Sequence, residues 1–222
     1  MIGFQIRQRA RAVDAAVVER YRQLPVANVS DVMSRMFAGG AQLRPMHDGT
    51  VMGGPAVTVR CRPGDNLMVH KALEVAQAGD VIVVDAGGDL TNAIIGEIMV
   101  AYAKKRGLAG IVIHGAIRDS AVIRRGDFPV FAAGVTHRGP YKDGPGEINV
   151  PISLGGMVIE PGDLMIGDAD GLLCVSFDDV EHIYRETAKK HAIEEQTLAD
   201  IDAGAYDASW VDARLKALGA AP

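Results

Sequence analysis

Short runs of apolar residues, rich in valine and isoleucine, recur through the middle of the chain, and glycine or proline separates nearly all of them. Runs of this length and composition are typical of strands that are buried in a sheet. We therefore expect strands at residues 56–60, 81–85, 110–114, 130–132, 157–159, 164–166 and 172–175.

Two longer segments, residues 66–78 and 94–106, lie between the first three of these runs and have an apolar residue at every third or fourth position. This period predicts helices, so the middle of the chain alternates strand, helix, strand, helix and strand, an order typical of a parallel sheet. After Val130 the strands follow one another without helices, which favours antiparallel hairpins or a small barrel-like layer.

Helical periodicity is also found at both ends of the chain. Residues 15–24 are expected to form a first helix. Residues 28–30 resemble the N-cap of a second helix that continues to Met36, with Asp31 in its first turn. Residues 178–199 predict a long amphipathic helix. Helices therefore flank the strand-rich middle.

The composition is that of an ordinary globular protein, since 48% of the 222 residues are hydrophobic, 23% are charged and the net charge is −5. Acidic and basic residues are interspersed, and no polybasic block supplies the charge that nucleic-acid or anionic-membrane binding needs. The N-terminal residues lack the apolar core of a signal peptide, and no apolar run approaches the roughly 18 residues of a membrane span. We expect one cytoplasmic domain that binds neither partner.

The cysteine and glycine patterns exclude several common cofactors. Cys61 and Cys174 lie in apolar runs without a second cysteine nearby, so buried free thiols are expected and no redox centre is indicated. The histidines lack the spacing of a zinc-binding helix. The glycine turn after Asp85 fits neither the dinucleotide fingerprint nor the phosphate-binding loop, so nucleotide binding is not expected.

Arg118 and Asp119 come directly after a buried strand pattern, and Gly96 and Glu97 lie upstream of that strand. In α/β sheets ligands gather at the carboxyl ends of strands. A planar, permanently charged guanidinium beside two acids suits a small carboxylate or keto acid held together with a hard divalent cation. The alternative is a solvated structural ion pair between Arg118 and Asp119.

A second feature is the segment formed by Gly96, Glu97, Ile98 and Met99, which lies at or near a helix start. Unpaired backbone amides and the positive end of the helix dipole would hold a carboxylate there. The alternative is a plain helix N-terminus in which Glu97 is only a favourable first-turn charge.

His114 precedes Arg118 by four residues, which places the two side chains on one face of the sheet if the strand stays regular that far. A packed, hydrogen-bonded core histidine is favoured over a general base at this position.

Several segments, in order along the chain, strongly resemble the RraA-like family: Gly96-Glu97, residues 106–119 with Arg118-Asp119 at their end, residues 128–131 and residues 161–171. The catalytic branch of that family is the 4-hydroxy-4-methyl-2-oxoglutarate/4-carboxy-4-hydroxy-2-oxoadipate aldolases. The resemblance covers about residues 26–175, so it implies a single RraA-like domain, residues 1–222, with that core and helical extensions at both ends.

The resemblance implies an α/β fold, a swivelling β/β/α-type sandwich with a central parallel or mixed sheet and a long C-terminal helix. It also implies a homotrimer or homohexamer with active sites at subunit interfaces. The implied activity is that of a class II pyruvate aldolase that requires Mg²⁺ or Mn²⁺. Such an enzyme cleaves a 4-hydroxy-2-oxo diacid to pyruvate and decarboxylates oxaloacetate as a side activity.

By the same resemblance Asp119 is the direct metal ligand, and Arg118 contacts the keto oxygen of the substrate. Glu97 is a second acid that reaches the metal through water. The resemblance assigns the binding of the pyruvyl carboxylate to the backbone amides of Gly96, Glu97, Ile98 and Met99. The acids that resemble those donated by an adjacent subunit are Asp31 and either Glu194 or Glu195.

The chain departs from the family pattern at Val122, where the aldolase branch usually has an acid, and His114 replaces a different polar residue or aspartate. The identity of the diacid is therefore open. Two other functions are also considered. One is a non-catalytic regulator that binds ribonuclease E, like the founding branch of the family. The other is a menaquinone methyltransferase, although the chain has no glycine-rich loop for S-adenosylmethionine.

Overall fold

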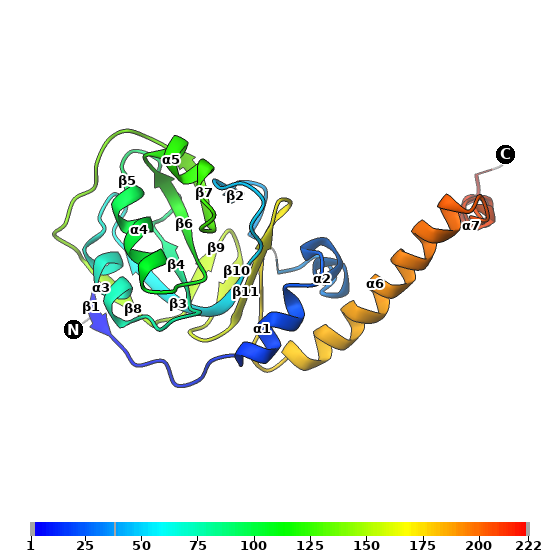
Figure 1. Ribbon diagram of the computed structural model, residues 1–222, viewed down its shortest axis with the longest axis horizontal. Coiled ribbons are helices and arrows are strands. Elements are labelled where there is room, and N and C mark those ends of the chain that lie inside the picture. Colours follow the sequence, from blue (N-terminus) through cyan, green and yellow to red (C-terminus); the bar gives the residue numbers. More distant parts are fainter. Residues whose placement is uncertain (1–2, 38, 221–222) are drawn as a thin grey trace.

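The computed structural model describes residues 3–37 and 39–220 (Figure 1). Most strands join one mixed sheet, in which β3 pairs in parallel with β4, β4 with β6, and β6 with β7. β8 and β2 pair antiparallel at the two sides of this parallel centre. The parallel pairing predicted from the alternating sequence pattern is confirmed. From edge to edge the main path is β1 (Phe4–Ile6), β8 (Gly146–Ile148), β3 (Met52–Cys61), β4 (Val81–Asp85), β6 (Gly110–Ile117), β7 (Val130–Val135) and β2 (Arg44–Pro45).

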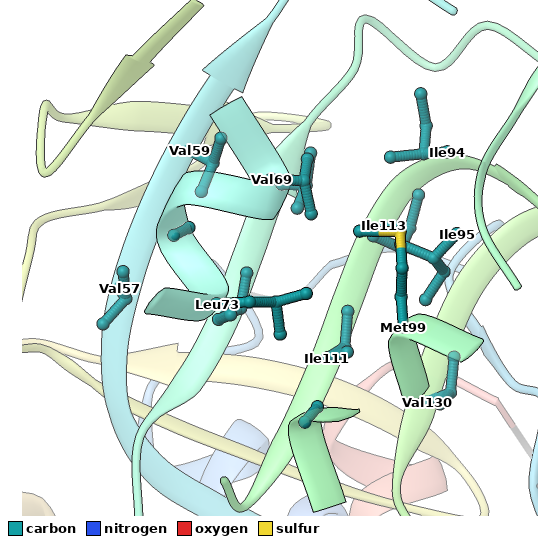
Figure 2. Packing of buried hydrophobic residues seen from close by; sticks show 14 of the residues in the cluster. Val57, Val59, Val69, Leu73, Ile94, Ile95, Met99, Ile111, Ile113 and Val130 are labelled. Carbon is teal, nitrogen blue, oxygen red and sulfur yellow. The ribbon is translucent and has the colours of Figure 1, made fainter. Parts of the chain in front are cut away.

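Three helices connect the parallel strands and cover one face of the sheet (Figure 1). They are α3 (Leu67–Val75), α4 (Glu97–Lys105) and α5 (Ser120–Arg125). Their apolar side chains and those of the sheet form a continuous buried cluster, so this face is closed to water. Figure 2 labels part of the cluster: Val57, Val59, Val69, Leu73, Ile94, Ile95, Met99, Ile111, Ile113 and Val130.

The other face of the sheet is covered by an antiparallel hairpin, β9 (Ile152–Leu154) and β10 (Met157–Ile159). The side chains of β4 are buried on both faces of the sheet. Ile82 belongs to the cluster on the helix side, and Val83 belongs to the cluster that includes the hairpin. A strand buried on both faces is apolar at every position, and this explains the unbroken apolar runs. The result is the β/β/α sandwich that the resemblance implied.

A third core joins both ends of the chain to the sandwich. The hairpin β11 (Leu164–Asp168) and β12 (Gly171–Val175) extends the sheet, because β11 also pairs with β3. Helices α1 (Ala15–Tyr21) and α2 (Val26–Val32) and the start of α6 (Val180–Asp202) pack on this hairpin. The free cysteines are buried, as expected.

The C-terminal helices leave the body of the molecule. α6 projects away from the sandwich, and α7 (Ser209–Ala217) lies at its far end (Figure 1). α7 has no buried residue, and Trp210 is 61% exposed. The long C-terminal helix is confirmed. Within the described residues, no helix combines the length and the apolar character that crossing a bilayer demands.

The helix predicted over residues 94–106 is wrong at its start. Ala93–Ile95 forms β5, which pairs in parallel with β6, and α4 begins only at Glu97. Ile94 and Ile95 are fully or nearly fully buried, so their side chains supply the sheet layer of the core instead of one helix face. A short apolar run is compatible with a strand or with a buried helix segment. Here the pairing with β6 makes residues 93–95 a strand.

The predicted N-cap of the second helix is also wrong. α2 begins at Val26, directly after Pro25, whose fixed φ and missing amide hydrogen suit a helix start. Asn28 therefore lies inside the helix, and Asp31 lies in its last turn, not its first. The helix ends before Met36 is reached because Ser34 has a φ of +56°, in the left-handed region.

Asp65 fixes the loop that precedes β8. Its carboxylate is fully buried and accepts hydrogen bonds from the amides of Asp143 (2.7 Å), Gly144 (2.9 Å) and Leu67 (2.9 Å). Arg62 lies 3.3 Å away and balances its charge. A long connection on the surface is held in one conformation by these bonds, since each buried amide would otherwise lack a partner.

We predict that Asp65→Ala lowers the free energy of unfolding by about 3 kcal/mol, because buried amides lose their acceptor and Arg62 loses its counterion. Asp127→Ala is the control, because Asp127 is exposed and pairs with an exposed lysine, Lys104, so its loss should change the stability by less than about 1 kcal/mol. Urea denaturation measures both. Equal small effects would show that Asp65 does not hold the loop.

Candidate active site

Arg118 and Asp119 lie directly after β6, at the carboxyl end of the parallel strands. Asp119 has a φ of +56° and caps α5, so the chain turns sharply at this residue. A left-handed conformation costs energy for any residue with a Cβ, although aspartate tolerates it better than most. Strain of this kind is concentrated at functional sites in proteins. The turn directs the Asp119 carboxylate back toward α4.

The Asp119 carboxylate is anchored to the first residue of α4. Asp119 Oδ2 accepts a hydrogen bond of 3.0 Å from the backbone amide of Glu97. Gly96 makes this approach possible, since a Cβ at that position would lie 2.3 Å from Asp119 Oδ2 and 2.9 Å from Arg118 Cγ. The positive end of the helix dipole also favours a carboxylate here. The Asp119 side chain is thus held in place, with its Oδ1 free of any hydrogen bond to the described residues.

Arg118 and Asp119 do not form a tight ion pair. The Nε of Arg118 lies 3.7 Å from Asp119 Oδ2, and the two side chains are 43% and 36% exposed. An exposed pair at this distance contributes little to stability. Both groups are therefore accessible to a ligand, which argues against a purely structural role.

The first turn of α4 presents further donors. The first intrahelical hydrogen bond runs from the Val100 amide to the Gly96 carbonyl, so the amides of Ile98 and Met99 have no partner within the helix. Of the amides in this turn, the Asp119 carboxylate accepts a hydrogen bond from that of Glu97 alone. The remaining amides can hold a ligand carboxylate. A cavity of about 270 Å³ borders this turn and Arg118.

His114 and Arg118 are not brought together. His114 contacts Asp85 and lies beneath Gly88, whereas Arg118 is next to Gly96. The strand does not stay regular, because the register of β6 against β7 shifts between Ile113 and Ala116. His114 is packed as expected, but its Nδ1 is 3.6 Å from Asp85 and has no hydrogen bond to the described residues, so the hydrogen-bonded part of that prediction is wrong.

Val122 lies on α5, one turn after Asp119, and is 47% exposed. With Ile98 and Phe128 it lines an apolar groove of about 320 Å³ between α4 and α5, and Glu97 lies at the edge of that groove. The position where the family resemblance predicts an acid is therefore an apolar surface next to Glu97.

The residues at this site suit a cation that keeps most of its water. Among the residues that the structure describes, no three histidine, cysteine or acidic side chains gather closely enough to enclose a metal. Asp119 offers one free carboxylate oxygen, and Glu97 is exposed at the same helix start. Mg²⁺ commonly binds through one or two carboxylates, several waters and substrate oxygens. This donor set fits Mg²⁺ or Mn²⁺ and not a structural zinc site.

The other predicted acids form a separate cluster between α2 and α6, which lies apart from α4 and α5 (Figure 1). Lys190 bridges Asp31 (3.2 Å) and Glu194 (2.7 Å), and the Asn28 amide donates to Glu194 (2.8 Å). Glu195 pairs instead with His191 at 3.7 Å. Lys190 and Asn28 were not predicted, although the spacing of Lys190 and Glu194 by four residues is a recognisable helical pair.

The chain is similar to known proteins of one family. The RraA-like family model, described as Aldolase/RraA, matches residues 26–174. The chain is 41% identical over 178 residues to a Halalkalibacterium halodurans protein named "Putative 4-hydroxy-4-methyl-2-oxoglutarate aldolase". That match covers 80% of this chain and 85% of the relative.

Solved structures share the fold. The crystal structure of an uncharacterized protein from Pseudomonas syringae pv. tomato matches with a TM-score of 0.78 at 24% identity, covering 87% of this chain and 95% of the other. The structure of the RNA-processing inhibitor RraA from Thermus thermophilis matches with a TM-score of 0.63 at 32% identity. It covers 68% of this chain and 92% of that one.

We predict that Lys190→Met raises the pKa of the Glu194 carboxyl. In the native protein the Lys190 ammonium is the main cause that lowers this pKa, followed by the hydrogen bond from Asn28. A lowered pKa stabilises the fold above the pKa of the unfolded chain, and this contribution is lost as the pH falls through the folded value. The variant should therefore lose stability at neutral pH and little in acid.

Carboxyl ¹³C NMR across an acid titration measures the change. Lys189→Met is the matched control, because Lys189 pairs with Glu186 on the same helix and should leave Glu194 unchanged. An unchanged Glu194 titration in Lys190→Met would mean that the cluster does not hold this carboxylate.

Proposed function

The chain belongs to the RraA-like family, and from that premise we propose that it is a carbon–carbon lyase, a class II pyruvate aldolase that depends on Mg²⁺ or Mn²⁺. Its proposed substrate is a 4-hydroxy-2-oxo diacid such as 4-hydroxy-4-methyl-2-oxoglutarate, which it cleaves to pyruvate. The observation that carries the proposal is the bond between Asp119 Oδ2 and the Glu97 amide, because it places a carboxylate, a guanidinium and free helix amides around one point. The name of the relative from H. halodurans supports the same reaction.

Each group has a role in the proposed reaction. A divalent cation would supply Lewis-acid stabilisation of negative charge on the keto oxygen. Asp119 would hold that cation with its free oxygen, and Glu97 would contact the water around it. The planar guanidinium of Arg118 would stabilise the same oxygen. The amides of Ile98 and Met99 would bind the pyruvyl carboxylate.

These groups favour both aldol cleavage and decarboxylation. Breaking the bond between C3 and C4 leaves an electron pair on the pyruvyl fragment, which becomes the enolate of pyruvate and then takes up a proton. Loss of carbon dioxide from oxaloacetate leaves the same enolate. Arg118 would stabilise the charge that develops in both reactions, so oxaloacetate decarboxylation is the expected side activity.

The aldol reaction also needs a group that removes the proton of the substrate hydroxyl. We assign this role to the acidic cluster of an adjacent subunit in a trimer or hexamer. Asp31 and Glu194 lie together on the surface of α2 and α6, so one subunit can present both to its neighbour. Within one chain α2 and α6 lie apart from α5, the helix that Asp119 caps (Figure 1).

The competing function is a non-catalytic regulator that binds ribonuclease E. The likeness to the RNA-processing inhibitor RraA from T. thermophilis favours it. A regulator would co-purify with a ribonuclease and release no pyruvate, so one set of assays separates the two functions.

We predict that Asp119→Asn lowers kcat/KM by about 100-fold or more with both oxaloacetate and 4-hydroxy-4-methyl-2-oxoglutarate in the presence of Mg²⁺, because the neutral amide is a poor ligand for a hard cation. EDTA should abolish the wild-type reaction. Asp127→Asn is the control and should keep full activity, because Asp127 is an exposed acid in the loop after α5. Coupled detection of pyruvate measures each rate. An Asp119→Asn protein as active as wild type would refute the proposed metal site.

We further predict that Val122→Asp lowers the Mg²⁺ concentration for half-maximal activity by about fivefold, since an added charge near the cation is worth roughly 1 kcal/mol in water. The 47% exposure of Val122 allows the change without disturbing the core. Val122→Asn has the same shape without the charge and should have no effect. If both variants respond alike, the charge at this position does not act on the cation.

A further inference from the structure

The apolar groove between α4 and α5 adjoins the site of the proposed reaction. Its volume is about 320 Å³, and Ile98 lines both this groove and the cavity beside Arg118. Val122, on the opposite wall, lies one turn after Asp119, and its backbone amide donates to the Asp119 carbonyl at 3.0 Å. The groove therefore opens beside the residues that would hold the cation and the keto acid.

The walls and the base of the groove are hydrocarbon. Ile98 and Ala101 lie one turn apart on α4 and form one wall, and Val122 of α5 forms the other. The nearly buried side chains of Ile123 and Phe128 lie at the base. Ile98 is 77% exposed, a high value for an isoleucine beside a groove. An exposed apolar surface with a polar rim is typical of a binding site.

The charged residues of the groove disfavour an anionic ligand. Glu97 lines one end, and Lys104 and Asp127 line the other. Lys104 pairs with Asp127, so its positive charge is already balanced, and Glu97 leaves a negative charge beside the opening. Glu97 and Lys104 are about 10 Å apart along α4, given a rise of about 1.5 Å per residue. The groove thus suits a neutral hydrocarbon chain of several carbons.

On the basis of the proposed function, we propose that the groove between α4 and α5 binds a hydrocarbon substituent on C4 of the substrate, so that a longer alkyl chain is preferred to methyl and to an anionic carboxymethyl group. Ile98 and Val122 are specificity residues, because their side chains contact the substituent and take no part in bond cleavage. The reaction itself is unchanged. The bond between C3 and C4 breaks, the hydroxyl loses its proton, and the C4 fragment leaves as a 2-oxo acid that carries the substituent.

Three substrates that differ only in the C4 substituent test this preference. They are 4-hydroxy-4-methyl-2-oxoglutarate, 4-butyl-4-hydroxy-2-oxoglutarate and 4-carboxy-4-hydroxy-2-oxoadipate, in which carboxymethyl replaces methyl. In the wild type we expect kcat/KM for the butyl substrate to exceed that for the methyl substrate about tenfold, since each fully buried methylene favours binding about fourfold and the exposed groove buries the chain in part. The carboxymethyl substrate should have the lowest value. Coupled detection of pyruvate measures each rate.

Two variants at Val122 assign the preference to the groove. Val122→Phe fills the groove and should lower the ratio of kcat/KM for the butyl substrate to that for the methyl substrate about tenfold. Val122→Thr keeps the shape of the side chain and adds a hydroxyl, so it should lower the same ratio about threefold. Val158 is the matched control, because this exposed valine lies on β10, on the other face of the sheet. Val158→Phe and Val158→Thr should leave the ratio at its wild-type value.

A second readout separates this proposal from the proposed function. The exchange of pyruvate methyl hydrogens with deuterium in ²H₂O and Mg²⁺ needs neither the groove nor a C4 substituent. No exchange and no pyruvate release from any substrate in the wild type would refute the proposed aldolase, and the role of the groove with it.

Normal exchange together with equal kcat/KM for the methyl and butyl substrates, or with the highest value for the carboxymethyl substrate, would refute the role of the groove and leave the aldolase intact. In that case a lower mass of Val122→Phe than of wild type in sedimentation velocity would show that a second copy of the chain covers the groove instead.

Discussion

The hydrogen bond between the Asp119 carboxylate and the first amide of α4 is the constraint on which the site depends. It joins the end of β6 to the start of the helix before it, and it forms only because Gly96 has no Cβ and Asp119 adopts a left-handed conformation. The same bond leaves Arg118 accessible and leaves two helix amides free. One local contact thus holds the Asp119 carboxylate at the start of α4.

The sequence predicted the parts of this structure that follow from strong local patterns. Strands buried on both faces are apolar throughout, so β4 and β6 were found readily, and so was the motif at the end of β6. Predictions failed where contacts between distant parts of the chain determine the local structure. Ile94 extends the sheet because β6 is available to pair with it, and the irregularity in β6 separates His114 from Arg118.

A single chain holds only part of the proposed catalytic apparatus. Asp119 lies on the sandwich, whereas Asp31 and Glu194 lie between α2 and α6, and α7 exposes apolar side chains at the end of a long arm. In the proposed oligomer a neighbouring subunit would cover the apolar side chains of α7. The same neighbour would supply Asp31 and Glu194 to the proposed site. The groove at Val122 is apolar, so a cation in the proposed site would depend on Asp119 and on substrate oxygens.

The most direct measurement is a crystal structure of the protein with Mn²⁺ and pyruvate, collected at a wavelength where manganese scatters anomalously. We expect an anomalous peak within bonding distance of Asp119 Oδ1, with the pyruvate carboxylate on the amides of Ile98 and Met99 and its keto oxygen beside Arg118. A peak at the cluster of Asp31 and Glu194, with no pyruvate at α4, would contradict the assignment of Asp119 as the metal ligand of an aldolase.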